Sequence, residues 1–169
     1  MYLLKQGNLI AYATKTEEEI NSVKEYMPYD EIIETSENYI ILNGAFVTET
    51  EALQAKKTEK QAENTIKAKQ AVENGFVTFK NAQFETNAQT VGDLTATMLL
   101  MQASGSTEPY IWLSKDDLAV ELTVEDFGTL GGLIAEFKNA VWNEKYIAFK
   151  NQIEQAETLA ELEEIEIEY

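Results

Sequence analysis

Residues 110–153 read YIWLSKDDLAVELTVEDFGTLGGLIAEFKNAVWNEKYIAFKNQI, and this stretch decides how the C-terminal half of the chain folds. The apolar run Tyr110–Leu113 and the alternating run Leu118–Leu122 predict two strands joined by a polar turn. Thr123, followed three residues later by Asp126, matches a variant of the capping box and predicts a helix start. One long helix is then predicted, because apolar residues recur at spacings of three and four and then continue one residue offset: Phe127, Leu130, Ile134, Phe137 and Val141, then Trp142, Tyr146, Phe149 and Ile153.

The composition excludes several kinds of chemistry. A chain of 169 residues is long enough for one domain of ordinary size or two small ones. Its hydrophobic fraction of 44% is close to the average of globular proteins and is sufficient for a packed core. The chain has no Cys, His or Arg, which excludes disulfides, thiolate nucleophiles, imidazole catalysis and arginine clamps on phosphate. Carboxylates could still hold calcium or magnesium. No apolar run approaches the ~18 residues of a membrane span, and residues 1–12 lack a signal-peptide layout. We therefore expect a cytoplasmic protein, or one released from the cell by a route other than secretion.

The net charge of −17 is concentrated near the C-terminus. Residues 110–169 carry 14 acidic side chains against four lysines. Such a surface repels a phosphate backbone, so we expect no nucleic-acid partner. The charge favours solubility, and a basic partner surface is the alternative interpretation.

Residues 1–50 predict a small α+β unit. Two strand-like runs flank the turn Gln6-Gly7-Asn8, and Thr16 with Glu19 predicts a capping box for a helix that reaches about Tyr26. A third strand is predicted at Tyr29–Glu34. A second hairpin is predicted around Asn43-Gly44, because both turn residues tolerate a positive φ.

Residues 51–74 predict a helix that links the two halves. The stretch is rich in Ala, Glu, Lys and Gln, with a capping box at Thr48 and Glu51 and a C-terminal cap at Gly75. Its apolar positions are small and form no full stripe, which favours a solvated spacer. Self-association along an alanine-rich seam is the alternative.

Residues 75–169 predict a C-terminal α+β domain of two hairpins packed on two or three helices. The first hairpin turns at Lys80-Asn81-Ala82, and Asn87 caps the helix after it. A flexible loop is predicted at residues 103–109, and Thr158 opens a final acidic helix. The fold class predicted for the whole chain is therefore α+β. Its C-terminal core is predicted to contain Phe79, Phe84, Leu94, Met98, Trp112, Leu122, Phe127, Leu130, Ile134 and Phe137.

Asp116 and Asp117 form an acidic pair in a predicted turn, with Glu121 nearby. Three interpretations are open. The side chains can bond backbone amides, as Asp does in turns, which we favour. They could hold calcium, although the ligand spacing of an EF-hand is missing. They could also cleave a glycosidic bond if they are held ~5–9.5 Å apart in a cleft.

Other residues have a structural and a functional interpretation. Trp112 could stack on sugar, but a single aromatic in an apolar strand favours the core. Met98 and Met101 could form an adaptable binding face, although their spacing favours core packing. Gly131-Gly132 lies inside a helical pattern with no preceding strand, so close helix packing or a kink is favoured over a phosphate loop.

Five short motifs follow one another in the C-terminal half: Phe79, Lys80–Asn87, Trp112–Asp117, Leu122-Thr123 with Phe127 and Leu130, and Ala156–Leu162. Their order resembles an uncharacterised domain family encoded in phages and prophages, typically among tail-fibre genes and often after a variable N-terminal segment. The resemblance covers about residues 75–167 and rests on the order of the motifs more than on any one of them. Residues 1–74 match the family only in general layout.

This resemblance implies a tail or tail-fibre component, or a fibre-assembly factor, that binds other proteins without catalysis. The expected partners are tail or tail-fibre proteins, with self-association through residues 51–74 as a second mode and no nucleic acid or membrane. The expected location is the host cytoplasm during assembly, with the virion tail as a second place. The family contributes no catalytic motif, so no catalytic, metal or cofactor residue is assigned. The alternative is a carbohydrate-active or metal-binding virion protein that uses Asp116, Asp117 and Glu121.

Overall fold

A computed structural model describes residues 1–6, 9–42 and 45–169 of the chain. The chain divides into two compact units, and each is described by itself. Unit 1 comprises Met1–Glu59 and Ala156–Glu164, and unit 2 comprises Lys60–Gln155 and Ile165–Tyr169. Division into folding domains at residues 51 and 74 stays a prediction.

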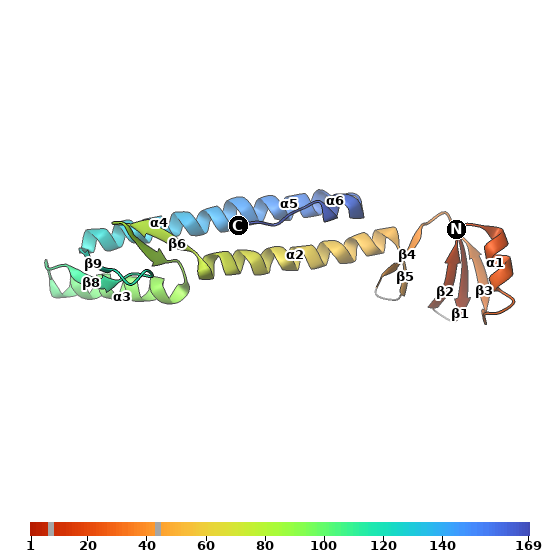
Figure 1. Cartoon of the computed structure of the whole chain (residues 1–169), viewed down its shortest axis with the longest axis horizontal. Helices are drawn as coiled ribbons and strands as arrows, with labels where there is room; N and C mark the ends of the chain where they lie inside the picture. Colours follow the sequence, from red (N-terminus) through yellow and green to blue (C-terminus); the bar gives the residue numbers. More distant parts are fainter. Residues whose placement is uncertain (7–8, 43–44) are drawn as a thin grey trace. The chain divides into compact units, whose positions relative to one another are not determined.

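Unit 1 contains a three-stranded antiparallel sheet. Its strands β1 (Tyr2–Gln6), β2 (Leu9–Thr14) and β3 (Glu31–Glu34) lie in the order β2-β1-β3 (Figure 1). Successive residues of a strand point to opposite faces, so the burial of both Leu3 and Leu4 means that β1 is covered on both faces. Two residues of the predicted turn at 6–8, Gly7 and Asn8, lie outside the described residues.

A short helix packs on this sheet. Helix α1 (Glu17–Val23) begins where the Thr16 side chain accepts a hydrogen bond from the backbone N–H of Glu19, as the capping signal predicts. It contacts β1 and β2, and its Ile20 is buried. The helix ends at Val23 and not at the predicted Tyr26.

A hairpin and two helical segments complete unit 1. Strands β4 (Tyr39–Leu42) and β5 (Ala45–Thr48) pair with each other, while their predicted turn Asn43-Gly44 lies outside the described residues. Helix α2 (Glu49–Asn74) follows at once, and α6 (Leu159–Glu163) belongs to the same unit. The predicted capping box at the start of α2 is confirmed, since Thr48 and Glu51 exchange backbone-to-side-chain hydrogen bonds of 2.9 and 3.1 Å.

Helix α2 is more buried than a solvated spacer would be. Ala52 is fully buried in unit 1, and Asn64 and Ala68 are fully buried in unit 2. The interpretation of α2 as a solvated spacer is therefore wrong. Two of these buried residues are alanines and the third is polar, so the buried side of the helix does not show in the sequence as a stripe of large apolar residues.

Unit 2 contains two hairpins and their helices. The first hairpin consists of β6 (Phe76–Phe79) and β7 (Ala82–Glu85), and α3 (Ala88–Ser104) follows it. The second consists of β8 (Tyr110–Leu113) and β9 (Ala119–Leu122), which leads into α4 (Val124–Asn139) (Figure 1).

The core of unit 2 lies between the hairpins, α3 and α4. Six of the ten predicted core residues are buried there: Phe84, Leu94, Leu122, Phe127, Leu130 and Ile134. Phe79, Met98 and Trp112 are half-buried against them, and Met101 is buried in the same cluster, so core packing is the correct interpretation of both methionines. Phe137 lies elsewhere, beside Gly75.

The long predicted helix is interrupted by a π-helical turn. Between α4 and α5 (Ile147–Gln155) the segment η1 (Ala140–Tyr146) is π-helical. The expectation that the offset of the apolar stripe at Trp142 belongs to an ordinary long helix is therefore wrong. A π turn takes up an extra residue and so shifts the face that a helix presents. Val141 and Ile153 are consequently both buried.

The glycines also differ from expectation. Gly75 follows the last residue of α2 without a positive φ, whereas Gly105 has a φ of 65° and caps α3. A Cβ at Gly131 or Gly132 would meet no atom within 4 Å, so close helix packing is the wrong interpretation of that pair. Gly131 instead borders a hollow of about 190 Å³ between α3 and α4.

The fold class is α+β, built from antiparallel hairpins and helices, as predicted. Unit 2 has the predicted two hairpins packed with helices. No helix within the described ranges is long and apolar enough to cross a membrane.

Candidate interaction site

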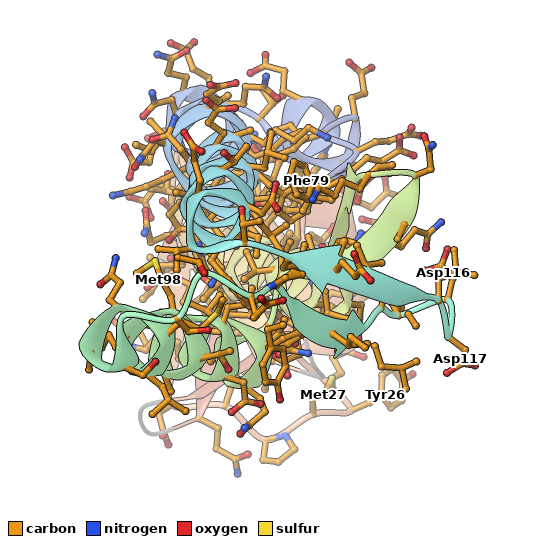
Figure 2. All side chains as sticks on the ribbon, turned by 90° about the vertical axis from the view of Figure 1, so that its left-hand side faces the viewer. Tyr26, Met27, Phe79, Met98, Asp116 and Asp117 are labelled. Carbon is orange, nitrogen blue, oxygen red and sulfur yellow. The ribbon has the colours of Figure 1, made fainter. Side chains whose placement is uncertain are left out.

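The acidic turn between β8 and β9 joins the two hairpins of unit 2. Figure 2 shows Asp116 and Asp117 at the tip of the β8–β9 hairpin. The carboxylate Oδ1 of Asp116 accepts hydrogen bonds from the Ser114 hydroxyl, at 2.6 Å, and from the backbone N–H of Gln83 in β7, at 3.1 Å. The backbone N–H of Lys115 donates to the Gln83 carbonyl at 2.8 Å. Asp116 thus uses its charge to hold one hairpin against the other.

These hydrogen bonds change the acidity of Asp116. The hydroxyl of Ser114 and the amide of Gln83 stabilise the carboxylate and hold the pKa of Asp116 below its ordinary value. Asp117 has a left-handed backbone with a φ of 57°, which the tight turn requires. Glu121 lies on β9, opposite Ile111 of β8. Among the described residues, no group of three or more acidic side chains is placed to hold a metal ion.

A second acidic residue holds the other hairpin. Lys80 and Asn81 form the two-residue loop of β6–β7, both with positive φ. The Lys80 ammonium donates to the carboxylate of Asp126 at 2.6 Å and to the carbonyl of Glu121 at 3.0 Å. Asp126 also completes the capping box with Thr123, and the Lys80 hydrogen bond is the largest cause of its lowered pKa. The turn of the β6–β7 hairpin is therefore linked through Lys80 and Asp126 to the N-terminal cap of α4.

An open groove of about 740 Å³ lies between β7, α3 and β8. The whole of β8 lines the groove, together with Phe84 and Glu85 of β7. Helix α3 contributes residues that share one helical face and have small or short side chains, which leave the groove open: Thr90, Asp93, Ala96 and Thr97.

The backbone of β8 presents an unpaired edge to this groove. The backbone N–H of Ser114 donates to the Leu118 carbonyl, so residues at even positions of β8 bond to β9. The N–H and C=O groups of Ile111 and Leu113 therefore point away from β9. Lys115, next in the same series, already bonds to β7, and β8 has no other partner among the described strands.

The outer face of the β8–β9 hairpin is apolar and exposed. Trp112 turns inward and packs edge-on against Phe127, with ring centroids 6.0 Å apart. Ile111 and Leu113 turn outward and are 66% and 64% exposed. Leu99 and Leu100 of α3 are also exposed. Core packing is thus the correct interpretation of Trp112, while its neighbours leave apolar surface uncovered.

The sequence patterns single out the acidic turn as a candidate site and do not single out the groove. A signal was present: Tyr110–Leu113 is apolar at all four positions, although a two-stranded hairpin buries only one face. A strand of this kind has apolar side chains that its own fold does not cover. The contribution of Glu85 and Asp93 carried no signal, because only the tertiary structure brings β7, α3 and β8 together.

A family model described as "Domain of unknown function (DUF4376)" matches residues 54–169. The match confirms the predicted resemblance to an uncharacterised domain family. It begins at residue 54 instead of residue 75, and so takes in most of α2. No curated protein and no solved structure matches the chain.

Proposed function

The chain belongs to the DUF4376 family, and we propose that it is a non-catalytic, tail-associated protein of a phage or prophage that acts by binding other proteins. The observation that carries the proposal is the exposed apolar surface of the β8–β9 hairpin and α3. Ile111 and Leu113 lie two residues apart on one face of β8, and exposed apolar side chains grouped in this way mark protein interaction sites.

The acidic turn supports the same proposal. A catalytic carboxylate must be free to contact its substrate, whereas Asp116 is occupied by Ser114 and Gln83. Its pKa is also lowered, so the carboxyl group is deprotonated near neutral pH and has no proton to donate. An enzyme built on Asp116, Asp117 and Glu121 would have to break the contact between the hairpins.

The proposed partners are tail or tail-fibre proteins, met in the host cytoplasm during assembly. The protein acts either as a subunit that stays in the virion tail or as an assembly factor that leaves. The number of copies in purified particles separates the two roles. Self-association through α2 is a less favoured mode, because Asn64 and Ala68 are already buried within unit 2.

Co-expression with a tail-fibre protein of the same phage or prophage genome tests the proposal. We expect the two proteins to purify together. Replacing Ile111 and Leu113 by Ser should weaken the complex, because both side chains are exposed in the free protein and apolar. The matched control is Glu136→Gln with Glu144→Gln, two exposed positions outside the hairpin.

Loss of a surface-polysaccharide hydrolase activity in an Asp117→Asn/Glu121→Gln variant would contradict the proposal and establish the enzyme instead. Failure of the wild-type chain to purify with any tail protein, both from infected cells and after co-expression, would also contradict it.

A further inference from the structure

We infer that the free edge of β8 takes up an extended, positively charged peptide segment of a partner protein, which adds to the β8–β9 hairpin as a third strand. The inference rests on the proposed function and names the site and the chemistry of the partner. The ligand is a strand of about four to six residues, to match the four residues of β8, with apolar side chains alternating with Lys or Arg.

The backbone geometry supports strand addition. The N–H and C=O groups of Ile111 and Leu113 face the groove, and a new strand can bond to these outward groups. At one end the groove closes where Lys115 bonds to Gln83 of β7. Apart from that hydrogen bond, β7 and β8 belong to separate sheets, and both line the groove of about 740 Å³ into which a strand can insert.

The charge around the groove selects the partner. Residues 81–122 carry six acidic side chains and a single lysine, Lys115. That lysine is turned towards the end of α2, where its ammonium donates to the Asn74 carbonyl at 3.3 Å and lies over the Phe76 ring at 5.0 Å. The charged residues that line the groove are Glu85, Asp93 and Lys115. Because the ammonium of Lys115 is engaged by Asn74 and Phe76, the two carboxylates attract a basic strand and repel an acidic one.

The carboxylates keep capacity for such a strand. Asp93 accepts hydrogen bonds from the side chain of Gln89, and Glu85 accepts from Asn87 and Thr90. Each carboxylate has about four acceptor sites, so a lysine or arginine can still pair with it.

A second copy of this chain is a poor occupant of the groove. Pairing β8 with β8 of another copy would bring two sets of Glu85, Asp93 and Glu121 together, and each chain has a net charge of −17. Like charges placed together at an interface cost binding free energy. Charge complementarity therefore favours a basic partner over self-pairing.

Titration with synthetic hexapeptides tests the inference. The probe is an acetylated and amidated peptide of alternating valine and lysine, added to the full-length chain. Backbone amide exchange at Ile111 and Leu113 should slow by about tenfold or more at saturation, because new strand hydrogen bonds protect both amides. A peptide with methylated backbone nitrogens tests the hydrogen bonds, and one of alternating valine and glutamate tests the charge. Neither should protect these amides.

Variants of the protein separate backbone from side-chain recognition. Leu113→Pro removes an outward N–H and should weaken probe binding about tenfold or more, whereas Leu113→Thr keeps the N–H and should bind within about threefold. Asp93→Lys should weaken binding about three- to tenfold, while Glu136→Lys, with the same charge change outside the groove, should leave it unchanged. Unchanged tryptophan fluorescence shows that each variant is folded.

Three outcomes would overturn the inference. Exchange at Ile111 and Leu113 that stays unchanged at saturating probe excludes strand addition. Equal binding of the lysine and glutamate probes excludes the charge selection. If the amides of Ile111 and Leu113 are protected from exchange without any peptide, and this protection rises with protein concentration as a dimer forms, the groove binds a second copy of the chain. If Leu113→Pro still purifies with a tail-fibre protein while peptide binding is lost, the edge is not the tail contact although the proposed function stands.

Discussion

Gly75 lies directly beneath the ring of Phe137. A Cβ at position 75 would be 2.6 Å from Cε1 and Cζ of Phe137, and 2.5 Å from the backbone carbonyl oxygen of Ala71. Phe137 comes from α4, whereas Gly75 lies between α2 and β6. The glycine is therefore required by the close approach of α4, and the ring occupies the space that a side chain would need.

Gly75→Ala should lower the free energy of unfolding of unit 2 by about 1–3 kcal/mol, because the added methyl group must displace an aromatic ring and a backbone carbonyl. Both tryptophans lie in unit 2, so their fluorescence in a denaturant titration measures the change. Gly131→Ala is the matched control and should be neutral or stabilise by about 0.5–1 kcal/mol, since its Cβ meets no atom. Equal losses in both variants would show that Phe137 does not press on Gly75.

Asp116→Asn should destabilise the contact between the two hairpins at neutral pH. Hydrogen bonds from Ser114 and Gln83 lower the pKa of Asp116, so its stabilising effect is present above the ordinary value of 3.8 and is lost as pH falls through the lowered pKa. Unfolding of wild type and variant, compared from pH 7 downwards, should converge in acid. Asp117→Asn is the control. Asparagine also tolerates the positive φ at this position, so the stability of this variant at pH 7 should equal that of wild type. A gap between wild type and Asp116→Asn that persists below the lowered pKa would refute this role.

Lys80→Gln should raise the pKa of Asp126 towards its ordinary value. The ammonium of Lys80 is the first cause of the lowered pKa, and the two groups are 2.6 Å apart. Carboxyl carbon shifts followed by NMR against pH measure the change. Lys138→Gln is the control. Lys138 lies on the same helix as Asp126, about 18 Å along the axis at ~1.5 Å per residue, so the substitution should leave the pKa of Asp126 unchanged.

Asn64→Ala should cost about 1–3 kcal/mol in the free energy of unfolding of unit 2, because it leaves buried partners unpaired. The fully buried Asn64 amide donates to the carbonyl of Tyr146, the last residue of the π-helical segment, at 3.1 Å, and its oxygen accepts from the Tyr169 hydroxyl. Tyr169→Phe removes only the second bond and should cost about 0.5–1.5 kcal/mol. A larger loss for Tyr169→Phe than for Asn64→Ala would place the main contact elsewhere.

Phe127→Ala and Ile134→Ala should each cost about 2–5 kcal/mol, as large-to-small changes in a packed core do. Both side chains are 3% exposed and face the hairpins and α3. Leu100→Ala is the control, since Leu100 is 68% exposed, and should change stability by less than about 0.5 kcal/mol. Tryptophan fluorescence in a denaturant titration again measures the free energy of unfolding. If Phe127→Ala and Ile134→Ala lower it by less than Leu100→Ala does, these two side chains are not part of the core.

The sequence by itself determined the local elements of this protein. The capping signals at Thr48 and Thr123, the hairpin turn at Lys80 and Asn81, and the core stripe of α4 all depend on residues a few positions apart. Hydrogen bonds within one turn and the period of a helix are local properties, so a pattern in the sequence is sufficient to predict them.

Only the tertiary structure decided what depends on residues far apart in the chain. Asp116 meets Gln83 across 33 positions, and Phe137 presses on Gly75 from another helix. The π turn takes up the one-residue offset of the apolar stripe, which the sequence pattern alone assigns to an uninterrupted helix. The free edge of β8 also follows from which strands pair, and strand pairing depends on the packing of the whole unit rather than on any single run of residues.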